Sequence, residues 1–117
     1  MLDLLWFLLL GHYLGDFALQ SDAMARTKGS SKRTLTEHVT IYTLCIAASL
    51  GIGLQLSGSD AFVSSITLIV LLVLFAEHWI QDLIKETKFN GSKQAFFVDQ
   101  GLHVAILFLM RIFVFDG

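Results

Sequence analysis

Four long, nearly continuous apolar segments dominate the sequence and limit what the chain can fold into. Each has about the 20 mostly apolar residues that a helix needs to cross a bilayer. The segments are 2–20, 35–56, 61–84 and 95–115. Their apolar runs do not alternate with polar residues, and backbone groups in lipid need partners within their own element, so we expect helices. The predicted fold is all-α: a four-helix transmembrane bundle with up-down-up-down order, formed by residues 1–117 as one integral membrane domain.

The composition supports a membrane protein. Of the 117 residues, 55% are hydrophobic and only 15% are charged, and the mean hydropathy is +0.69. Soluble domains carry about 25% charged residues. The net charge of −2 gives no field that attracts polyanions, which argues against a nucleic-acid partner. The single cysteine, Cys45, excludes a disulfide framework and a cysteine-rich zinc module.

The basic residues predict how the chain is oriented. Seven of the eight Lys and Arg lie in the connections 21–34 and 86–94 or at the adjoining Lys85, and the exception is Arg111. The positive-inside rule therefore places both long loops in the cytoplasm and both termini outside. The first segment begins with Asp3 and lacks a basic stretch before it, so we do not expect it to be a cleaved signal peptide.

Histidines and aspartates recur in a pattern that suggests a duplicated helical hairpin. The four histidines fall one to a segment, at His12, His38, His78 and His103. The first and third are each followed four residues later by an aspartate, Asp16 and Asp82. The next histidine comes 26 residues after the first and 25 residues after the third. The two halves of the chain thus resemble each other as a parallel repeat.

The polar residues of all four segments are predicted to meet at one depth, in the half nearer the cytoplasm. Residues three or four apart share a helix face. This spacing aligns His12 with Asp16, His38 with Tyr42, His78 with Asp82 and Lys85, and Asp99 with His103. Because charged groups are costly against lipid, we expect these faces to turn inward to a shared cavity.

Such a cluster suits a metal ion. Imidazole and carboxylate side chains one helical turn apart can reach a common point, and together they favour transition metals over calcium or magnesium. We predict one or two divalent ions, zinc first, with iron or manganese as alternatives. The predicted ligands are His12, Asp16, His38, His78, Asp82 and His103. Asp99 is a candidate further ligand or general base, and Lys85 a candidate cation for an anionic substrate.

A purely structural interpretation competes with the metal site. Polar residues in membrane helices often hold neighbouring helices together through hydrogen bonds without any ion. Gly11 and Gly15 have the spacing of a close helix contact, and Tyr42 is expected to be a hydrogen-bonding partner rather than a ligand.

The same residues carry a resemblance to a known family. They are the stretch Leu10-Gly-His-Tyr-Leu-Gly-Asp-Phe-Ala-Leu-Gln20, then Met24-Ala-Arg-Thr-Lys28, His38, His78-x-x-x-Asp82-x-x-Lys85 and Asp99-Gln100-x-x-His103. At these positions the chain resembles the small bacterial and phage membrane proteins of the family called domain of unknown function 3307. The resemblance covers nearly the whole chain. It implies a stand-alone multi-span protein, expected in the inner membrane of a bacterium, whose recurrent motif positions are these polar residues.

Several functions fit these features. The first hypothesis is a metal-dependent hydrolase that acts on a lipid or a lipid-linked substrate, with Lys85 and loop residues Arg26 or Lys28 holding a phosphate. The alternatives are a metal or proton transport module, a haem protein, and a structural subunit in which the polar layer only fixes helix packing. Membrane lipids are the expected partners, and assembly into a homo-oligomer is left open.

Overall fold

A computed structural model describes residues 3–19, 21, 31–57, 65–88 and 93–113. Within these ranges the chain forms helices and no strand, as predicted. The elements are α1 (Leu4–Tyr13), the π-helical segment η1 (Leu14–Ala18), α3 (Lys32–Leu56), α4 (Ser65–Lys88) and α5 (Lys93–Phe113). Because η1 continues α1 directly, the described residues form four helices at the four predicted places.

Three of these helices contain stretches long and apolar enough to cross a membrane: Lys32–Leu56, Ser65–Lys85 and Phe96–Phe113. The first apolar helix, Leu4–Phe17, is shorter. A crossing by this helix therefore stays a prediction, as do the cytoplasmic side of the loops and the outer position of the termini. Gln20, Arg26 and Lys28 lie outside the described residues.

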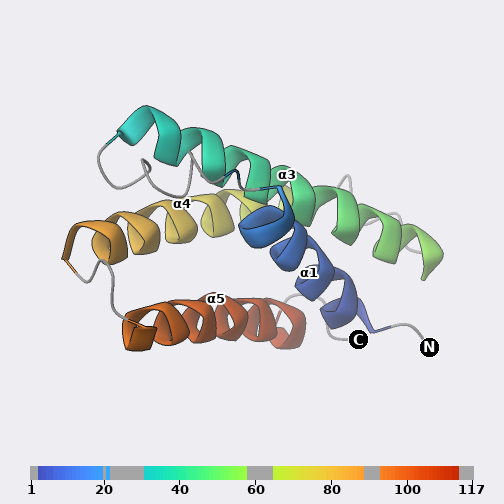
Figure 1. The fold of residues 1–117 in the computed structure, drawn as a ribbon. Helices are drawn as coiled ribbons and strands as arrows, with labels where there is room; N and C mark the ends of the chain where they lie inside the picture. Colours follow the sequence, from blue (N-terminus) through green and yellow to red (C-terminus); the bar gives the residue numbers. More distant parts are fainter. Residues whose placement is uncertain (1–2, 20, 22–30, 58–64, 89–92, 114–117) are drawn as a thin grey trace.

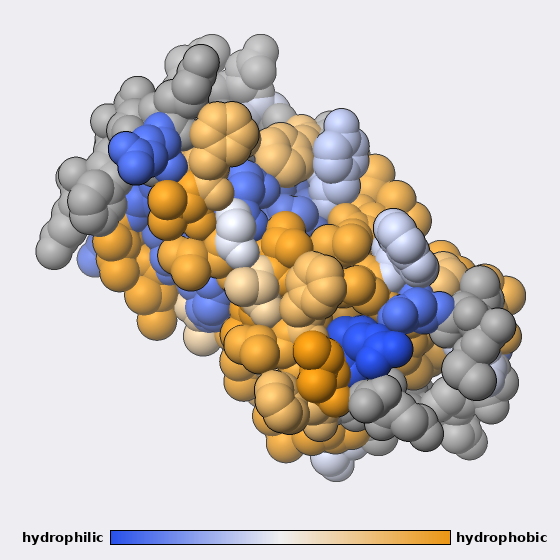
Figure 2. Space-filling model, turned by 90° about the horizontal axis from the view of Figure 1, so that it is seen from below, coloured by the Kyte–Doolittle hydropathy of each residue, from blue (hydrophilic) through white to orange (hydrophobic). Residues whose placement is uncertain are grey.

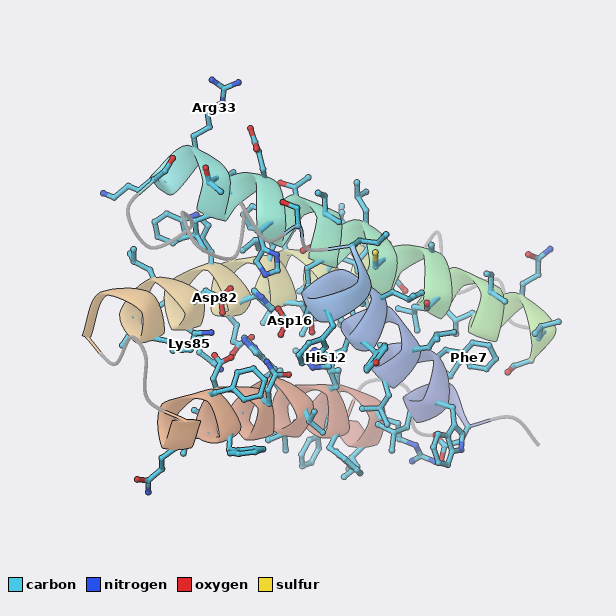
Figure 3. The ribbon with its side chains drawn as sticks, in the orientation of Figure 1. Phe7, His12, Asp16, Arg33, Asp82 and Lys85 are labelled. Atoms are coloured by element: carbon cyan, nitrogen blue, oxygen red, sulfur yellow. The ribbon has the colours of Figure 1, made fainter. Side chains whose placement is uncertain are left out.

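Helix α3 begins three residues before the apolar segment that predicted it. Ser31 is its N-cap, and the Ser31 hydroxyl accepts a hydrogen bond from the backbone N–H of Thr34 at 3.2 Å. Such a cap satisfies one of the free N–H groups of the first turn. The basic residues Lys32 and Arg33 are thus helical rather than part of the loop, and Arg33 points away from the bundle (Figure 3).

The first helix widens at its end. At the end of η1 the backbone N–H of Leu19 donates to the carbonyl of Leu14 at 2.8 Å. This is a π-type bond, which joins residues five apart in the sequence instead of the four of an α-helical bond. Asp16 lies inside this wider turn. Single π turns within α-helices are frequent at functional sites, since the extra residue changes the direction of the side chains that follow.

Two glycines let the first helix lie directly on α3. A Cβ atom at Gly11 would be 2.8 Å from the Cα of Ile46, and one at Gly15 would be 2.7 Å from the Cα of Tyr42. Both distances are shorter than side chains tolerate. The predicted close contact at Gly11 and Gly15 is confirmed, and its partner is α3.

The helices form a bundle in which α1 and α4 each pack against both α3 and α5. Figure 1 shows α3 and α5 on opposite sides, with the short α1 crossing between them and α4 filling the remaining side. The interior at one end is an apolar core of Leu8, Tyr42, Ile46, Leu50, Leu54, Val70, Leu74 and Leu107. The outer face on the side of α5 is largely hydrophobic (Figure 2), as expected of a surface that contacts lipid.

Candidate metal centre

Polar residues from all four helices meet in the interior next to the apolar core. This polar cluster consists of Asp16, His38, His78, Asp82, Asp99 and His103, none of them more than 4% exposed. His12 lies beside it and is 5% exposed. Figure 3 shows His12, Asp16, Asp82 and Lys85 within the bundle, between its helices. The predicted convergence of one polar face from each helix is therefore confirmed.

Four residues offer ligand atoms around one point: Asp16, His38, His78 and Asp82, called here the first ligand group. The Nε2 of His38 is 3.1 Å from Asp16 Oδ1, 3.2 Å from His78 Nε2 and 3.3 Å from Asp82 Oδ2. The Nε2 of His78 is 3.5 Å from Asp16 Oδ1 and 3.3 Å from Asp82 Oδ2. A tetrahedral ion with bonds of about 2.0–2.1 Å has ligands about 3.3–3.4 Å apart. The first ligand group therefore has the spacing of a tetrahedral metal site.

A second ligand group lies against the first and shares Asp16 with it. It is formed by Asp16, Asp99 and His103, whose ligand atoms lie within 4.8 Å of one another. The Nε2 of His103 is 3.3 Å from Asp99 Oδ1 and 3.4 Å from Asp82 Oδ1. The structure thus brings five of the six predicted ligands, together with Asp99, into two adjoining groups.

The sixth predicted ligand, His12, uses both ring nitrogens in hydrogen bonds. Its Nε2 donates to Oε1 of Gln100 at 2.9 Å, and its Nδ1 accepts from the hydroxyl of Tyr42 at 2.8 Å. The amide nitrogen of Gln100 in turn donates to Asp16 Oδ2 at 2.8 Å. His12 therefore acts on the cluster through Gln100, which directs Oδ1 of Asp16 toward the two histidines of the first ligand group. Groups of this kind orient metal ligands and tune their affinity.

Lys85 and Gln81 hold Asp99 at the edge of the cluster. The Nζ of Lys85 is 3.5 Å from Asp99 Oδ2, and the Lys85 side chain is 18% exposed. The amide nitrogen of Gln81 donates to Asp99 Oδ1 at 2.9 Å and to its backbone carbonyl at 2.8 Å. Neither Gln81 nor Gln100 was among the predicted ligands. Gln100 belongs to the motif Asp99-Gln100-x-x-His103 that carries the family resemblance, whereas the signal for Gln81 is position alone, since it precedes Asp82.

Aromatic rings pack the cluster from the side of the apolar core. The ring of His78 contacts the ring of Tyr42 at a centroid distance of 3.9 Å and stacks on that of His103 at 4.0 Å and an interplanar angle of 9°. The Nδ1 of His103 is 3.5 Å from Glu77 Oε2. These contacts hold the rings of His78 and His103 with Nε2 directed at the cluster.

The donor set fits a transition metal rather than calcium or magnesium. The first ligand group supplies two imidazole nitrogens and two carboxylate oxygens, a mixture that suits zinc, iron or manganese. The ring nitrogen Nδ1 of His78 has no hydrogen-bond partner within the described residues, so its Nε2 is the polar contact that His78 makes. The residues present can therefore hold a divalent ion.

Comparison with known proteins identifies a family but no characterised relative. No curated protein and no solved structure matches the chain. A family profile matches nearly its whole length, and the matched range contains the polar cluster. The chain belongs to the family described as "Protein of unknown function (DUF3307)", which matches residues 4–116.

Proposed function

We propose that this protein binds a divalent transition metal ion, zinc in the first instance, inside its helical bundle. The observation that carries the proposal is the first ligand group, in which the distances from the Nε2 atoms of His38 and His78 to each other and to the carboxylate oxygens of Asp16 and Asp82 fall between 3.1 and 3.5 Å. The ion would be held by Asp16, His38, His78 and Asp82.

Burial of charge also supports an ion. Asp16 is 4% exposed and Asp82 is 0% exposed, and both carboxylates approach the same pair of imidazole rings. Placing carboxylates in an apolar interior is costly unless a cation is bound close by. A divalent ion between them balances two negative charges without requiring either histidine to be protonated.

The test is elemental analysis of the detergent-purified protein and of the variant His78→Ala. We expect at least one ion per chain in the unmodified protein and one ion fewer in the variant, which lacks a ligand of the first ligand group. Glu37→Gln is the matched control, since Glu37 adjoins His38 in the sequence but is exposed and pairs with Arg33 at 3.2 Å. Metal-free unmodified protein that is folded, and that takes up no zinc when zinc is added, would overturn the proposal in favour of a structural polar layer.

The reaction that this centre supports best is hydrolysis of a lipid or lipid-linked substrate. A bound zinc ion lowers the pKa of water toward 7 and so supplies hydroxide at neutral pH. Asp99 lies beside the ligand atoms and would accept the proton, and the partly exposed Lys85 would hold an anionic head group such as a phosphate. The hydrophobic exterior gives a lipid substrate direct access to the surface of the protein (Figure 2).

Hydrolysis is tested with vesicles of phosphatidylglycerol and purified protein loaded with zinc. We expect release of a water-soluble product that Asp99→Asn abolishes while metal at the first ligand group is retained. Metal or proton transport is the competing function, and flux across protein-containing liposomes measures it. Most buried residues beyond the cluster, such as Ile46, Leu50 and Leu74, are apolar, and the small hydroxyls of Ser49 and Thr67 are the exceptions among the described residues. This interior does not favour a polar path through a single chain.

A further inference from the structure

We infer that the polar cluster has a second metal position, held by Asp99 and His103 and bridged to the first position by Asp16 and Asp82. This inference rests on the proposed function and adds the number of ions and the residues that hold each one. It concerns Asp99 and His103 of the second ligand group, which the first ion does not need.

The spacing of the second group supports an ion there. His103 Nε2 lies 3.3 Å from Asp99 Oδ1 and 3.4 Å from Asp82 Oδ1. These distances again equal the edges of about 3.3–3.4 Å expected around an ion with bonds of about 2.0–2.1 Å. His103 is 0% exposed, so bulk water does not compete with an ion for its Nε2.

Asp82 faces both positions with different oxygens. Its Oδ2 is 3.3 Å from the Nε2 atoms of His38 and His78, whereas its Oδ1 is 3.4 Å from the Nε2 of His103. A carboxylate placed in this way can bridge two ions, with one oxygen on each. Asp16 offers a ligand atom to both groups as well.

The stacked histidines set the distance between the two positions. The rings of His78 and His103 are nearly parallel, at 9°, and their centroids are 4.0 Å apart. Ions bound to the Nε2 atoms of two parallel rings are separated by about the ring spacing. Two-metal sites hold their ions about 3.5–4 Å apart, so the stack has the spacing that such a pair requires.

The two positions differ in chemistry. The first has two histidines, whereas the second has His103 alone among carboxylates, a donor set richer in oxygen that binds harder ions better. The Nζ of Lys85 lies 3.5 Å from Asp99 Oδ2, so an ion in the second position meets a positive charge near its ligand. We therefore expect the second ion to bind more weakly than the first.

The experiment is a Co²⁺ titration of metal-free, full-length protein in detergent, followed by absorption and by equilibrium dialysis. We expect two equivalents per chain in the unmodified protein and in Glu37→Gln, and one equivalent in Asp99→Asn. In Lys85→Met we expect the second equivalent to bind about tenfold or more tightly, because a repelling charge has been removed. A role of Lys85 in packing alone would not raise that affinity.

The outcomes separate the two proposals. Absence of any Co²⁺ binding by folded protein overturns the proposed function and the second position together. Saturation at one equivalent, with Asp99→Asn unchanged, overturns only the second position. Two equivalents that persist in Asp99→Asn also overturn it, because the second ion then lies elsewhere. If Asp99→Asn does not fold, the stoichiometry of the unmodified protein and the affinity in Lys85→Met decide.

Discussion

The two ends of the bundle interior are built on the same helix faces yet depend on different forces. On α3, His38 belongs to the polar cluster, while Ile46 and Leu50 belong to the apolar core. On α4, Leu74 in the core and His78 in the cluster are neighbours four residues apart on one face. All five side chains are 1% exposed or less.

This difference separates packing from charge. The apolar core is stabilised by dispersion and by close fit, so each of its side chains contributes by its volume. The polar cluster places three carboxylates and three imidazoles at positions as buried as those of the apolar core. Charges at such positions are costly unless opposite charges balance them. A bound ion should therefore stabilise one end of the bundle only, and substitutions at the two ends should be distinguishable.

Removing the metal should have the largest effect on stability. A ligand that binds only the folded state, at about 1,000 times its Kd, stabilises a protein by about 4 kcal/mol. We expect a chelator to lower the thermal unfolding temperature of the unmodified protein markedly and that of His78→Ala hardly at all. Equal shifts in the two proteins, measured by circular dichroism in detergent, would mean that the ion acts elsewhere.

Leu74→Ala should destabilise the other end while leaving metal binding intact. Truncation of a buried leucine costs about 3 kcal/mol, from lost contacts and from the cavity that remains. We expect the metal content of Leu74→Ala to equal that of the unmodified protein. A loss of metal in this variant would show that the apolar core and the polar cluster are coupled and do not respond independently to substitution.

Gly15→Ala tests how the first helix is positioned. The added Cβ would lie 2.7 Å from the Cα of Tyr42, a backbone atom that cannot move alone, so we expect a destabilisation of about 2 kcal/mol and weaker metal binding through Asp16. Gly101→Ala is the matched control, because no atom lies within 4 Å of its added Cβ. Similar unfolding temperatures for the two variants would refute the close contact.

Gln100→Ala should weaken metal binding without removing it. The amide of Gln100 joins His12 to Asp16, and loss of a group that orients a ligand typically costs about tenfold in affinity. We expect His12→Ala to have a similar effect, and the double variant to be little worse than either single one. Complete loss of the ion in His12→Ala, with Gln100→Ala unaffected, would instead make His12 a direct ligand, as the sequence predicted.

The smallest effect is expected at the far end of the apolar core, where Asp3 precedes α1. Arg111 donates to Asp3 at 2.9 and 3.2 Å and, with the backbone N–H of Leu5, lowers the pKa of the Asp3 carboxyl. Because the pKa is lowered in the folded state, the Asp3–Arg111 pair stabilises the fold fully at pH values above the ordinary pKa of aspartate. This stabilisation is lost as the pH falls through the lowered pKa. Asp3→Asn should thus be slightly less stable at pH 7 and equal to the unmodified protein in strong acid, as measured by thermal unfolding. A difference that is independent of pH would contradict this.

The pair also explains the one basic residue that departs from the predicted loop distribution. Arg111 is the only Lys or Arg predicted on the side of the termini, and in the structure it meets the acidic residue at the start of the chain. Two residues 108 positions apart are thereby joined, which the positive-inside pattern does not indicate. The structure thus accounts for Arg111 without a change in the predicted orientation.

The positions of the helices and the inward direction of their polar faces could be predicted because both depend on local spacing. An apolar run fixes a helix in lipid, and side chains one turn apart must share a face. The histidines and aspartates of α3, α4 and α5 accordingly met as expected. The π turn at Leu14–Ala18 was not predicted, because it depends on how α1 fits against α3.

The sequence by itself thus determined the helices and the composition of the buried polar layer. Only the tertiary structure decided which atoms face one another. His12-x-x-x-Asp16 and His78-x-x-x-Asp82 are equivalent in the sequence, yet His78 joins the first ligand group while His12 bonds to Tyr42 and Gln100. The physical reason is that ligand sets depend on differences of a few tenths of an ångström in helix separation and rotation, which here follow from a glycine contact and a π turn. A residue pattern that repeats every helical turn contains no information at that scale.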